Sequence, residues 1–323
     1  MNKFKPLAAT GLVAASILAS LAYAAYPDRP IRLILPFVPG GSSDLVARVV
    51  AAKAQGVLGQ PIIIDNRAGG GGIVATVTVA KAVPDGYTLL FAQTSHAANP
   101  YLVTTPLQYD TVKDFSSIAL LADHPGVIVA NPSKPYKTVT EFLAYSKANP
   151  GKVVYASAGI GTWPHLTMAL LAQQSGLKMV HVPYKGAAPS RVDLLAGRVD
   201  LKVEAFTSTA AFIKDGTLRA IAVTGKERIA DIPDVPTIAE SGFPGFDSSI
   251  WMGVLGPAGM QNDVITKLQQ AFVQASKDPA VVKELSAQGI YARGLPGKDL
   301  TALIQSEMAK WSVVIKAAGI VAE

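Results

Sequence analysis

The chain has 323 residues, half of them hydrophobic, and a formal net charge of +6 at pH 7. It contains no cysteine, which excludes disulfide bonds, a thiolate nucleophile and a cysteine-ligated zinc site. No run of basic residues with interleaved aromatic residues occurs, so we expect no nucleic-acid partner. The length and the apolar fraction allow two hydrophobic cores, and two domains are therefore expected.

The first 24 residues have the pattern of a secretory signal peptide. Lys3 and Lys5 precede a stretch without charge that continues to residue 26, and Ala22-Tyr23-Ala24 matches a small-x-small cleavage site. The apolar part is rich in Ala, Gly, Ser and Thr and is short for a membrane anchor, which needs about 20 strongly apolar residues. We expect residues 1–24 to be removed when the protein is exported.

Strand-like apolar runs alternate with helical patterns along the remaining chain. This alternation predicts an α/β fold with parallel, doubly wound sheets rather than a sandwich or a barrel. The predicted strands cover residues 31–37, 62–65, 87–93, 118–122, 126–130, 153–157, 179–183, 201–206, 219–224 and 248–255. Clear helical patterns cover residues 164–176, 189–197, 209–216, 263–276, 280–288 and 300–318, and we expect the last three to cover the first sheet.

The alternation is interrupted at two places. Residues 118–122 and 126–130 are joined only by Asp123-His124-Pro125, and residues 248–255 form another strand without a partner helix. We interpret both places as crossings between two sheets. This predicts lobe 1 from residues 25–123 and 247–323, and lobe 2 from residues 124–246. Two lobes joined by crossing strands form a hinged cleft that closes on a ligand.

A glycine-rich turn follows the first predicted strand. Gly40 and Gly41 leave backbone N–H groups uncovered, and the helix that starts near Ser42 directs its unpaired N–H groups and positive dipole end to the same place. Such a junction is typical of a binding site for a phosphate or a carboxylate. Alternatively, the glycines only make a tight turn, and Ser42, Ser43 or Asp44 is the helix N-cap.

Two further glycine-rich turns lie between a predicted strand and a helical pattern. One is residues 66–72, and the other is residues 158–165 with Gly159 and Gly161. In open α/β sheets, ligands bind at the carboxyl ends of the strands, where such turns meet. We therefore expect the three turns to converge on one cleft.

Four single side chains are candidates for that cleft. His96 and His165 follow predicted strands, but a local hydrogen bond at a helix start is the more frequent role of such residues. Trp163 lies inside the third glycine turn, where it either stacks on a ring of the ligand or packs on its own lobe. Glu204 either faces the ligand or, as is more common, forms a salt bridge.

Catalytic, cofactor and metal motifs are incomplete. The segments around Ser42 and Ser157 each lack one glycine of G-x-S-x-G, and neither a P-loop nor a complete G-x-G-x-x-G occurs. No two histidines have H-x-x-x-H spacing, so no metal is expected. We predict no catalytic residue and no cofactor. The enzyme alternative is a secreted serine hydrolase that pairs Ser42 or Ser157 with His96 or His165.

Several segments resemble the Bug family of periplasmic solute-binding receptors, which serve tripartite tricarboxylate transporters. They occur in order over essentially the whole mature chain and include Pro183-Tyr184-Lys185-Gly186 and Asp193-Leu194-Leu195-Ala196-Gly197. The other segments are residues 37–48, 58–60, 65–67, 84–90, 96–100, 218–224 and 235–240.

The resemblance implies a two-lobed Venus-flytrap fold of the periplasmic binding proteins. Main-chain N–H groups and ordered waters of its cleft loops are expected to hold a ligand carboxylate. Where the family often has an acidic residue this chain has Ala169, and where the family often has Phe-Asp it has Val203-Glu204. The implied binding residues are Phe37, Gly40, Gly41, Ser42, Asp44, Thr94, Ser95, His96, Gly159, Gly161, Thr162, Trp163, His165 and Glu204.

The resemblance also implies the role. It predicts a periplasmic, monomeric protein that is not an enzyme, that captures a small organic carboxylate and that delivers it to a membrane permease of the tripartite tricarboxylate type. A ligand-sensing receptor of the same fold is the alternative, since sensing and transport both need closure on a ligand.

Overall fold

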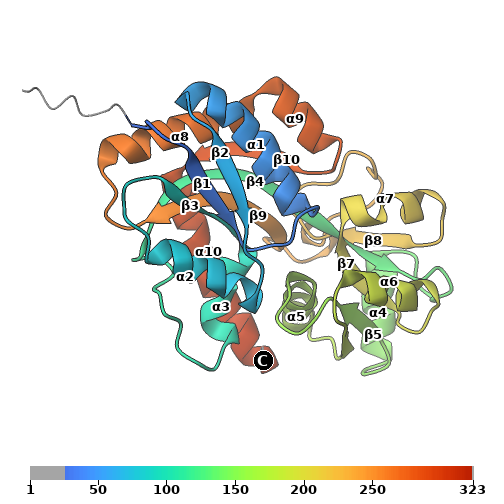
Figure 1. Cartoon of the computed structure of the whole chain (residues 1–323). Coiled ribbons are helices and arrows are strands. Elements are labelled where there is room, and N and C mark those ends of the chain that lie inside the picture. Colours follow the sequence, from blue (N-terminus) through green and yellow to red (C-terminus); the bar gives the residue numbers. More distant parts are fainter. Residues whose placement is uncertain (1–25, 322–323) are drawn as a thin grey trace, which may run out of the picture.

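The computed structural model describes residues 26–321 and has two groups of strands with helices packed against them (Figure 1). The predicted signal peptide lies outside the described residues. Within residues 26–321, no helix is long and apolar enough to cross a membrane. The alternation of strands and helices confirms the predicted α/β class.

Lobe 1 contains the first group of strands. Its order is β2-β1-β3-β9-β4, with β10 on the other edge of β4. Strands β1, β2 and β3 are parallel, whereas β9 runs antiparallel to both β3 and β4. The strands are β1 (Ile31–Leu35), β2 (Ile62–Asn66), β3 (Thr88–Gln93), β4 (Phe115–Ala130), β9 (Ser249–Pro257) and β10 (Tyr291–Pro296).

Lobe 2 contains the second group, which begins with the last residues of β4. That end of β4 pairs antiparallel with β7 (Leu201–Ala205) and β8 (Arg219–Val223). Strand β5 (Val154–Ser157) then lies parallel between β7 and β6 (Val180–Pro183). Figure 1 shows that lobe 2 is built from the middle of the chain, whereas the first and last parts of the described chain both contribute to lobe 1.

Strand β4 joins the lobes and differs from the prediction. The two runs expected at residues 118–122 and 126–130 form one strand of 16 residues, because Asp123-His124-Pro125 stays extended and pairs with β9. Pro125 has no N–H group, but it is the last residue paired with β9, and Gly126 is the first paired with β7. The missing donor thus falls where β4 exchanges partners, which a strand tolerates.

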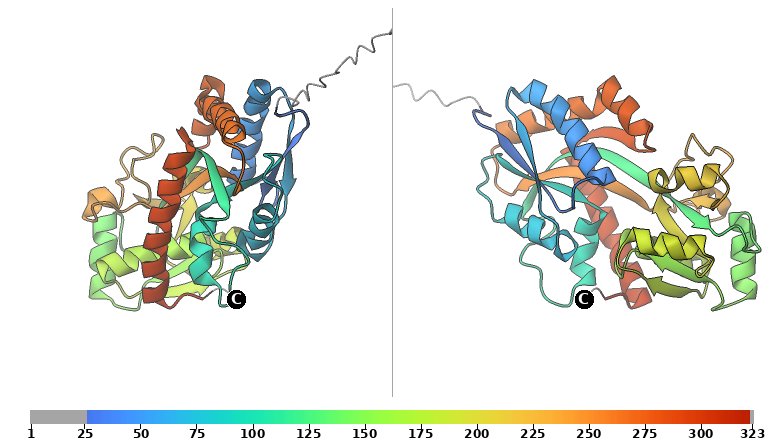
Figure 2. Two further views of the ribbon diagram at one scale, coloured as in Figure 1. Left: turned by 90° about the vertical axis from the view of Figure 1, so that its left-hand side faces the viewer. Right: turned by 45° about the vertical axis from the view of Figure 1, so that its right-hand side comes forward.

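The six helices with a predicted range, α5 to α10, agree with it to within three residues at each end. No range was predicted for α2, α3 and α4, and β10 was not predicted either. Helix α10 was expected only to cover the first sheet. It packs on α3 of lobe 1 and also on α5 of lobe 2 (Figure 2). Lobe 1 carries α1 (Ser42–Leu58), α2 (Ile73–Ala80), α3 (Thr94–Leu102), α8 (Asn262–Lys277), α9 (Pro279–Ser286) and α10 (Gly297–Ala318). Lobe 2 carries α4 (Val139–Ala148), α5 (Trp163–Ser175), α6 (Ala187–Leu195) and α7 (Phe206–Lys214). Two short 3₁₀ turns are η1 (Gly70–Gly72) and η2 (Ala239–Ser241).

One apolar cluster runs through both lobes. It joins Ile34 and Leu90 of lobe 1 to Leu201 of lobe 2, and it includes the fully buried Trp311 of α10. A second cluster lies under α1, α8 and α9 in lobe 1, and a third lies in lobe 2 around Val127 and Phe206. Burial of this apolar surface holds the loops between strands and helices in place.

Candidate functional site

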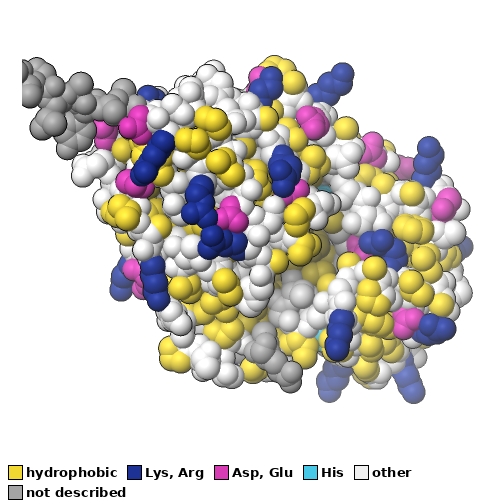
Figure 3. Space-filling view, in the orientation of Figure 1, with side chains coloured by type: hydrophobic (Ala, Val, Ile, Leu, Met, Phe, Trp, Pro, Cys, Tyr) yellow, Lys and Arg dark blue, Asp and Glu magenta, His cyan; other side chains and the backbone are white. Residues whose placement is uncertain are grey.

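A cavity of about 560 Å³ lies between the two lobes, and we call it the central cavity. Lobe 1 contributes the end of β1, the glycine turn η1 and the start of α3, and lobe 2 contributes the turn before α5. Figure 3 shows the surface hollowed between the lobes, with hydrophobic side chains on both sides. Six predicted site residues line the central cavity, namely Phe37, Thr94, Ser95, Gly161, Thr162 and Trp163.

Helices α3 and α5 both begin at this cavity. Their N-cap residues, Gln93 and Thr162, line it, and neither side chain accepts a hydrogen bond from the first helical turn. The first N–H groups of a helix have no carbonyl partner within the helix, and they carry the positive end of its dipole. Helix α2 also begins here, because its N-cap Gly72 and its first residue Ile73 line the cavity. The central cavity is thus approached by three helix starts, two from lobe 1 and one from lobe 2.

Two of the three glycine turns converge here, because Gly70–Gly72 lies opposite the turn with Gly161. Other lining residues, such as Asn99, Leu166 and Ile250, were not singled out from the sequence. Asn99 lies in the segment 96–100 that resembles the family, whereas Leu166 and Ile250 lie in none of the resembling segments. For Leu166 the usable signal was its place near the predicted helix start, and for Ile250 it was the predicted strand at residues 248–255.

The first glycine turn lies at a different hollow, of about 480 Å³, which we call the α1 hollow. Gly40, Gly41, Ser42 and Asp44 line it from lobe 1, and Ala205, Thr207 and Ser208 line it from lobe 2. The loop between β1 and α1 separates the two spaces, with Phe37 on the side of the central cavity. All three glycine turns were expected to converge on one cavity, but only two of them line the central cavity.

Asp44 holds the loop before α1. Its carboxylate accepts hydrogen bonds from the Gly40 N–H at 3.1 Å, from Arg48 at 2.9 and 3.0 Å and from the Asn66 amide at 3.1 Å. The Asn66 amide also donates to the Phe37 carbonyl at 2.9 Å. The hydrogen bond from Arg48 is the main reason that the pKa of Asp44 lies below its usual value. The negative charge nearest to the start of α1 is thus the carboxylate of Asp44, which belongs to the chain itself and not to a ligand.

The two glycines of this loop differ in conformation. Gly40 has a φ of +92°, which side chains rarely adopt, whereas Gly41 has a φ of −87°. A Cβ atom added to either would meet nothing within 4 Å. Only Gly40 therefore requires glycine for its backbone, and Gly41 is free to carry a side chain that projects into the α1 hollow.

His165 ties the glycine turn of lobe 2. Its Nδ1 accepts a hydrogen bond from the Gly161 N–H at 3.1 Å, so the local role at a helix start is confirmed. Its ring stacks on His181 at 3.7 Å between centroids. Burial and the neighbouring His181 lower the pKa of His165 to about 4, so the ring is neutral at pH 7. It lines a separate hollow of about 740 Å³ beside the end of α10, not the central cavity.

His96 and Gly159 also lie away from the central cavity. His96 is buried in lobe 1, where Nε2 contacts the Thr111 carbonyl at 3.0 Å and the ring packs edge-on against Phe115. Burial lowers the pKa of His96 to about 4. The Gly159 carbonyl accepts hydrogen bonds from the hydroxyl groups of Ser157 and Thr162. Both residues were expected on the cleft wall, but neither lies there. Each holds its own loop in place on the side away from the cavity.

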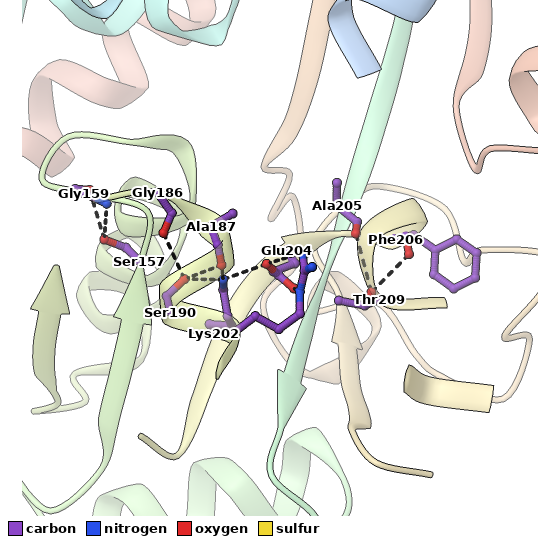
Figure 4. A network of polar contacts seen from close by, with 11 residues as sticks. Ser157, Gly159, Gly186, Ala187, Ser190, Lys202, Glu204, Ala205, Phe206 and Thr209 are labelled. Carbon is purple, nitrogen blue, oxygen red and sulfur yellow. Dashed lines mark hydrogen bonds and ion pairs between the residues drawn. The ribbon is translucent and has the colours of Figure 1, made fainter. Parts of the chain in front are cut away.

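Glu204 forms a salt bridge, the commoner of its two expected roles. Its carboxylate is buried and contacts Lys202 Nζ at 2.7 Å (Figure 4). It also contacts Arg191 Nε at 2.8 Å. Lys202 Nζ also donates to Ser190 Oγ at 2.6 Å. Burial is the main cause that lowers the pKa of Lys202, and Glu204 opposes it. Because these partners use the carboxylate, Glu204 is not a contact residue of the central cavity.

Trp163 lines the central cavity and rests on the crossing strand β4. A Cβ atom added to Gly126 would collide with the six-membered ring of the Trp163 indole. Glycine at this position of β4 therefore makes room for the indole. Trp163 is thereby fixed close to the point where β4 passes from lobe 1 to lobe 2.

The serine and histidine residues do not form a catalytic site. Ser157 Oγ lies 2.7 Å from His181 Nε2, but Ser157 is fully buried and also hydrogen-bonds to Gly159. Neither His96 nor His165 is hydrogen-bonded to Ser42 or Ser157 among residues 26–321, so the pairs of the hydrolase alternative are not formed. In the same part of the chain, no three His, Cys, Asp or Glu side chains are grouped to hold a metal.

Comparisons with known proteins agree with this architecture. The family described as "Tripartite tricarboxylate transporter family receptor" matches residues 46–320. Protein BugT of Bordetella pertussis is 36% identical over 322 residues, which cover 99% of each chain. The solved structure of R. palustris Rpa4515 with adipate has a TM-score of 0.78 and 31% identity, covering 92% of this chain and 99% of that one. MatC from Rhodopseudomonas palustris with bound malate has a TM-score of 0.75 and 32% identity, covering 90% and 100%.

Proposed function

Because this chain belongs to the receptors of the tripartite tricarboxylate transporter family, we propose that it captures a small organic carboxylate in the central cavity and delivers it to a membrane permease of that type. The family consists of periplasmic solute-binding receptors, which are not enzymes. Adipate and malate are the molecules named with two of the similar structures.

The observation that carries the proposal is that helices of both lobes start at the central cavity. Helix α3 offers the N–H groups of its first turn, which begins at Thr94. Helix α5 offers those of Trp163 and His165, because Pro164 has none. Each helix start is equivalent to about half a positive charge. A carboxylate placed between them would satisfy donors from both lobes and would draw the lobes together.

The α1 hollow has a second role in this proposal. Gly41 and Ser42 face Ala205 and Thr207 across it, so we assign these residues to the surfaces that approach when the lobes close. The hinge would lie where β4 exchanges β9 for β7 and where the chain enters β9, near the predicted boundaries at residues 124 and 247. Small-angle scattering should show a smaller radius of gyration with saturating ligand, and an unchanged radius would argue for a rigid cleft.

Thermal melting of the exported protein with a panel of small carboxylates tests the binding role. A ligand at 100 times its dissociation constant stabilises the folded state by about 2.7 kcal/mol, which raises the Tm of a chain this size by several degrees. The neutral amide of each acid is the control. We expect at least one acid, and not its amide, to raise the Tm. If no acid does so, or if the amides act equally, the proposal fails.

Delivery to a permease is tested in cells. Deletion of the gene should abolish uptake of the acid that binds, and re-expression should restore it. Unchanged uptake together with a lost cellular response to the acid would instead favour the sensing alternative.

A further inference from the structure

The glycine turn before α5 carries the lobe 2 residues of the central cavity. Gly161, Thr162 and Trp163 line the cavity, and the first N–H groups of α5 follow directly. Gly159 and Gly161 have positive φ values of +139° and +72°, and glycine is the most flexible residue of a chain. Hydrogen bonds to a ligand weaken steeply when a donor is displaced or tilted. The turn therefore serves binding only if its neighbours hold its shape.

The first end of the turn is held by a side chain of β6. His181 Nε2 lies 2.7 Å from Ser157 Oγ, at the end of the neighbouring strand β5. The same Ser157 oxygen accepts a hydrogen bond from the Gly159 N–H at 3.1 Å. Ser157 is fully buried, so water does not replace His181 as its partner. His181 thus fixes the serine that holds the first glycine of the turn.

The residues that follow His181 hold the same end through their backbone. The Tyr184 N–H donates to the Ser157 carbonyl, and the Gly186 N–H donates to the Ala158 carbonyl, both at 3.1 Å. Both donors belong to the segment 183–186, which resembles the family, and no residue of this segment lines the central cavity. The segment therefore contributes to the site by shaping the turn.

The second end of the turn is held by His165, and His181 supports that ring. His165 Nδ1 accepts a hydrogen bond from the Gly161 N–H at 3.1 Å. The imidazole rings of His165 and His181 are stacked, with centroids 3.7 Å apart and 17° between their planes. Tyr155 is paired opposite His181 in the sheet and stacks on it as well, with centroids 4.9 Å apart. His181 is thus itself fixed by a strand neighbour.

From these contacts, we propose that His181 is a positioning residue for ligand binding. It holds both ends of the lobe 2 glycine turn, the first through Ser157 and the second through His165, and thereby fixes the first N–H groups of α5 at the central cavity. His181 lines the hollow beside the end of α10 and not the central cavity, so it acts without touching the ligand. This inference rests on the proposed function and adds the residue that keeps the lobe 2 side of the site in shape.

Three variants separate the two contacts of His181. His181→Phe keeps a ring on His165 and loses the contact with Ser157. His181→Gln loses the ring but can keep the contact with Ser157, because its terminal amide reaches about as far as Nε2. His181→Leu loses both contacts. Val180→Ala, at the exposed preceding residue of β6, is the control.

Amide hydrogen exchange of the exported protein tests the positioning without a ligand. In His181→Leu, we expect the N–H groups of Gly159 and Gly161 to exchange at least about threefold faster, and those of residues 168–174 in α5 to stay within about twofold of the wild type. His181→Phe should affect Gly159 more, and His181→Gln should affect Gly161 more. Unchanged exchange in the turn, or equal acceleration in the turn and the helix, would overturn the inference.

Calorimetric titration with adipate and malate as probes then connects the turn to binding. We expect His181→Leu to bind the probe about threefold to tenfold more weakly than the wild type, with the Phe and Gln variants in between and Val180→Ala within about twofold. Faster exchange in the turn together with unchanged affinity would overturn the inference. If the wild type binds neither probe and the wider panel of acids also fails, the proposed function fails, while the exchange result still decides whether His181 holds the turn.

Discussion

The two loops that meet at the cleft are fixed by different chemistry. In lobe 1, the carboxylate of Asp44 holds the loop before α1 through Gly40, Arg48 and Asn66. In lobe 2, the neutral ring of His165 holds the turn before α5 through the Gly161 N–H group. In both lobes, hydrogen bonds to one titratable side chain hold a glycine-rich turn in place. The contacts in lobe 1 need an ionised Asp44 carboxylate, whereas the contact in lobe 2 needs an uncharged His165 ring.

This difference sets how each loop responds to acid. The pKa of Asp44 lies below its usual value, chiefly because of the hydrogen bond from Arg48, so the carboxylate stays ionised through mild acid. Protonation of His165 at Nδ1 removes the acceptor for Gly161, and its pKa is about 4. Both loops are therefore intact at neutral pH, and the loop of lobe 2 is expected to loosen as the pH approaches 4.

Valine at Gly40 and at Gly41 should separate the conformation of the lobe 1 loop from its contact with lobe 2. Gly40→Val should lower the free energy of unfolding by about 1–3 kcal/mol, because φ is +92° there. Gly41→Val should leave the Tm unchanged, since φ is −87° and the space is open. It should nevertheless weaken binding at least about tenfold by blocking closure on Ala205.

The Tm and the dissociation constant are measured on the same samples of both glycine variants. A Gly41→Val protein that melts as the wild type and binds with unchanged affinity would remove the α1 hollow from the closing surface. The Gly40→Val protein controls for loss of affinity that is caused by a distorted loop.

Removal of the charge that fixes lobe 1 should have the next largest effect. Asp44→Ala leaves the Gly40 N–H, the Arg48 guanidinium and the Asn66 amide without their acceptor, and we expect a loss of about 1–2 kcal/mol in urea unfolding. Asp65→Ala in the same lobe removes pairs with partly exposed arginines and should cost less than about 1 kcal/mol. Equal losses would mean that Asp44 acts only as a surface ion pair.

The histidine of lobe 2 should have the smallest effect near neutral pH. A histidine whose folded pKa is about 4 adds stability that is present above its unfolded pKa near 6.5 and is lost as the pH falls toward 4. Between pH 7 and pH 6, His165 should account for a loss below about 1 kcal/mol.

His165→Asn tests this contribution, because an asparagine oxygen can still accept from Gly161. The variant should take up about one proton fewer on unfolding between pH 4 and pH 6.5. Asp44→Asn is the matched change in lobe 1 and should leave the proton uptake in that range unchanged. The same pH dependence in wild type and His165→Asn would contradict the assignment of a buried neutral ring.

The sequence predicted the elements better than the directions of their side chains. Apolar runs and glycine turns located the α/β pattern, the crossing at β4 and the start of α5, since these depend on local periodicity and backbone chemistry. The side-chain partners come from residues distant in the chain. The His96 ring contacts the Thr111 carbonyl, and the Glu204 carboxylate pairs with Arg191 and Lys202. Neither side chain therefore faces the cleft.

The sequence pattern also did not predict which space the first glycine turn faces. Asn66 holds the Phe37 carbonyl and Asp44 together, so the loop turns Phe37 to the central cavity and Gly40 and Gly41 to the α1 hollow. That direction depends on one amide of β2, and the sequence did not indicate which groups this amide contacts. The turn itself was predictable, whereas the space that it faces was not.

A crystal structure of the exported protein with a bound carboxylate tests the central claim most directly. We expect carboxylate oxygens within about 3 Å of first-turn N–H groups of α3 and α5. A carboxylate bound in the α1 hollow, or in the hollow beside His165 and α10, with the central cavity free of ligand, would contradict the account.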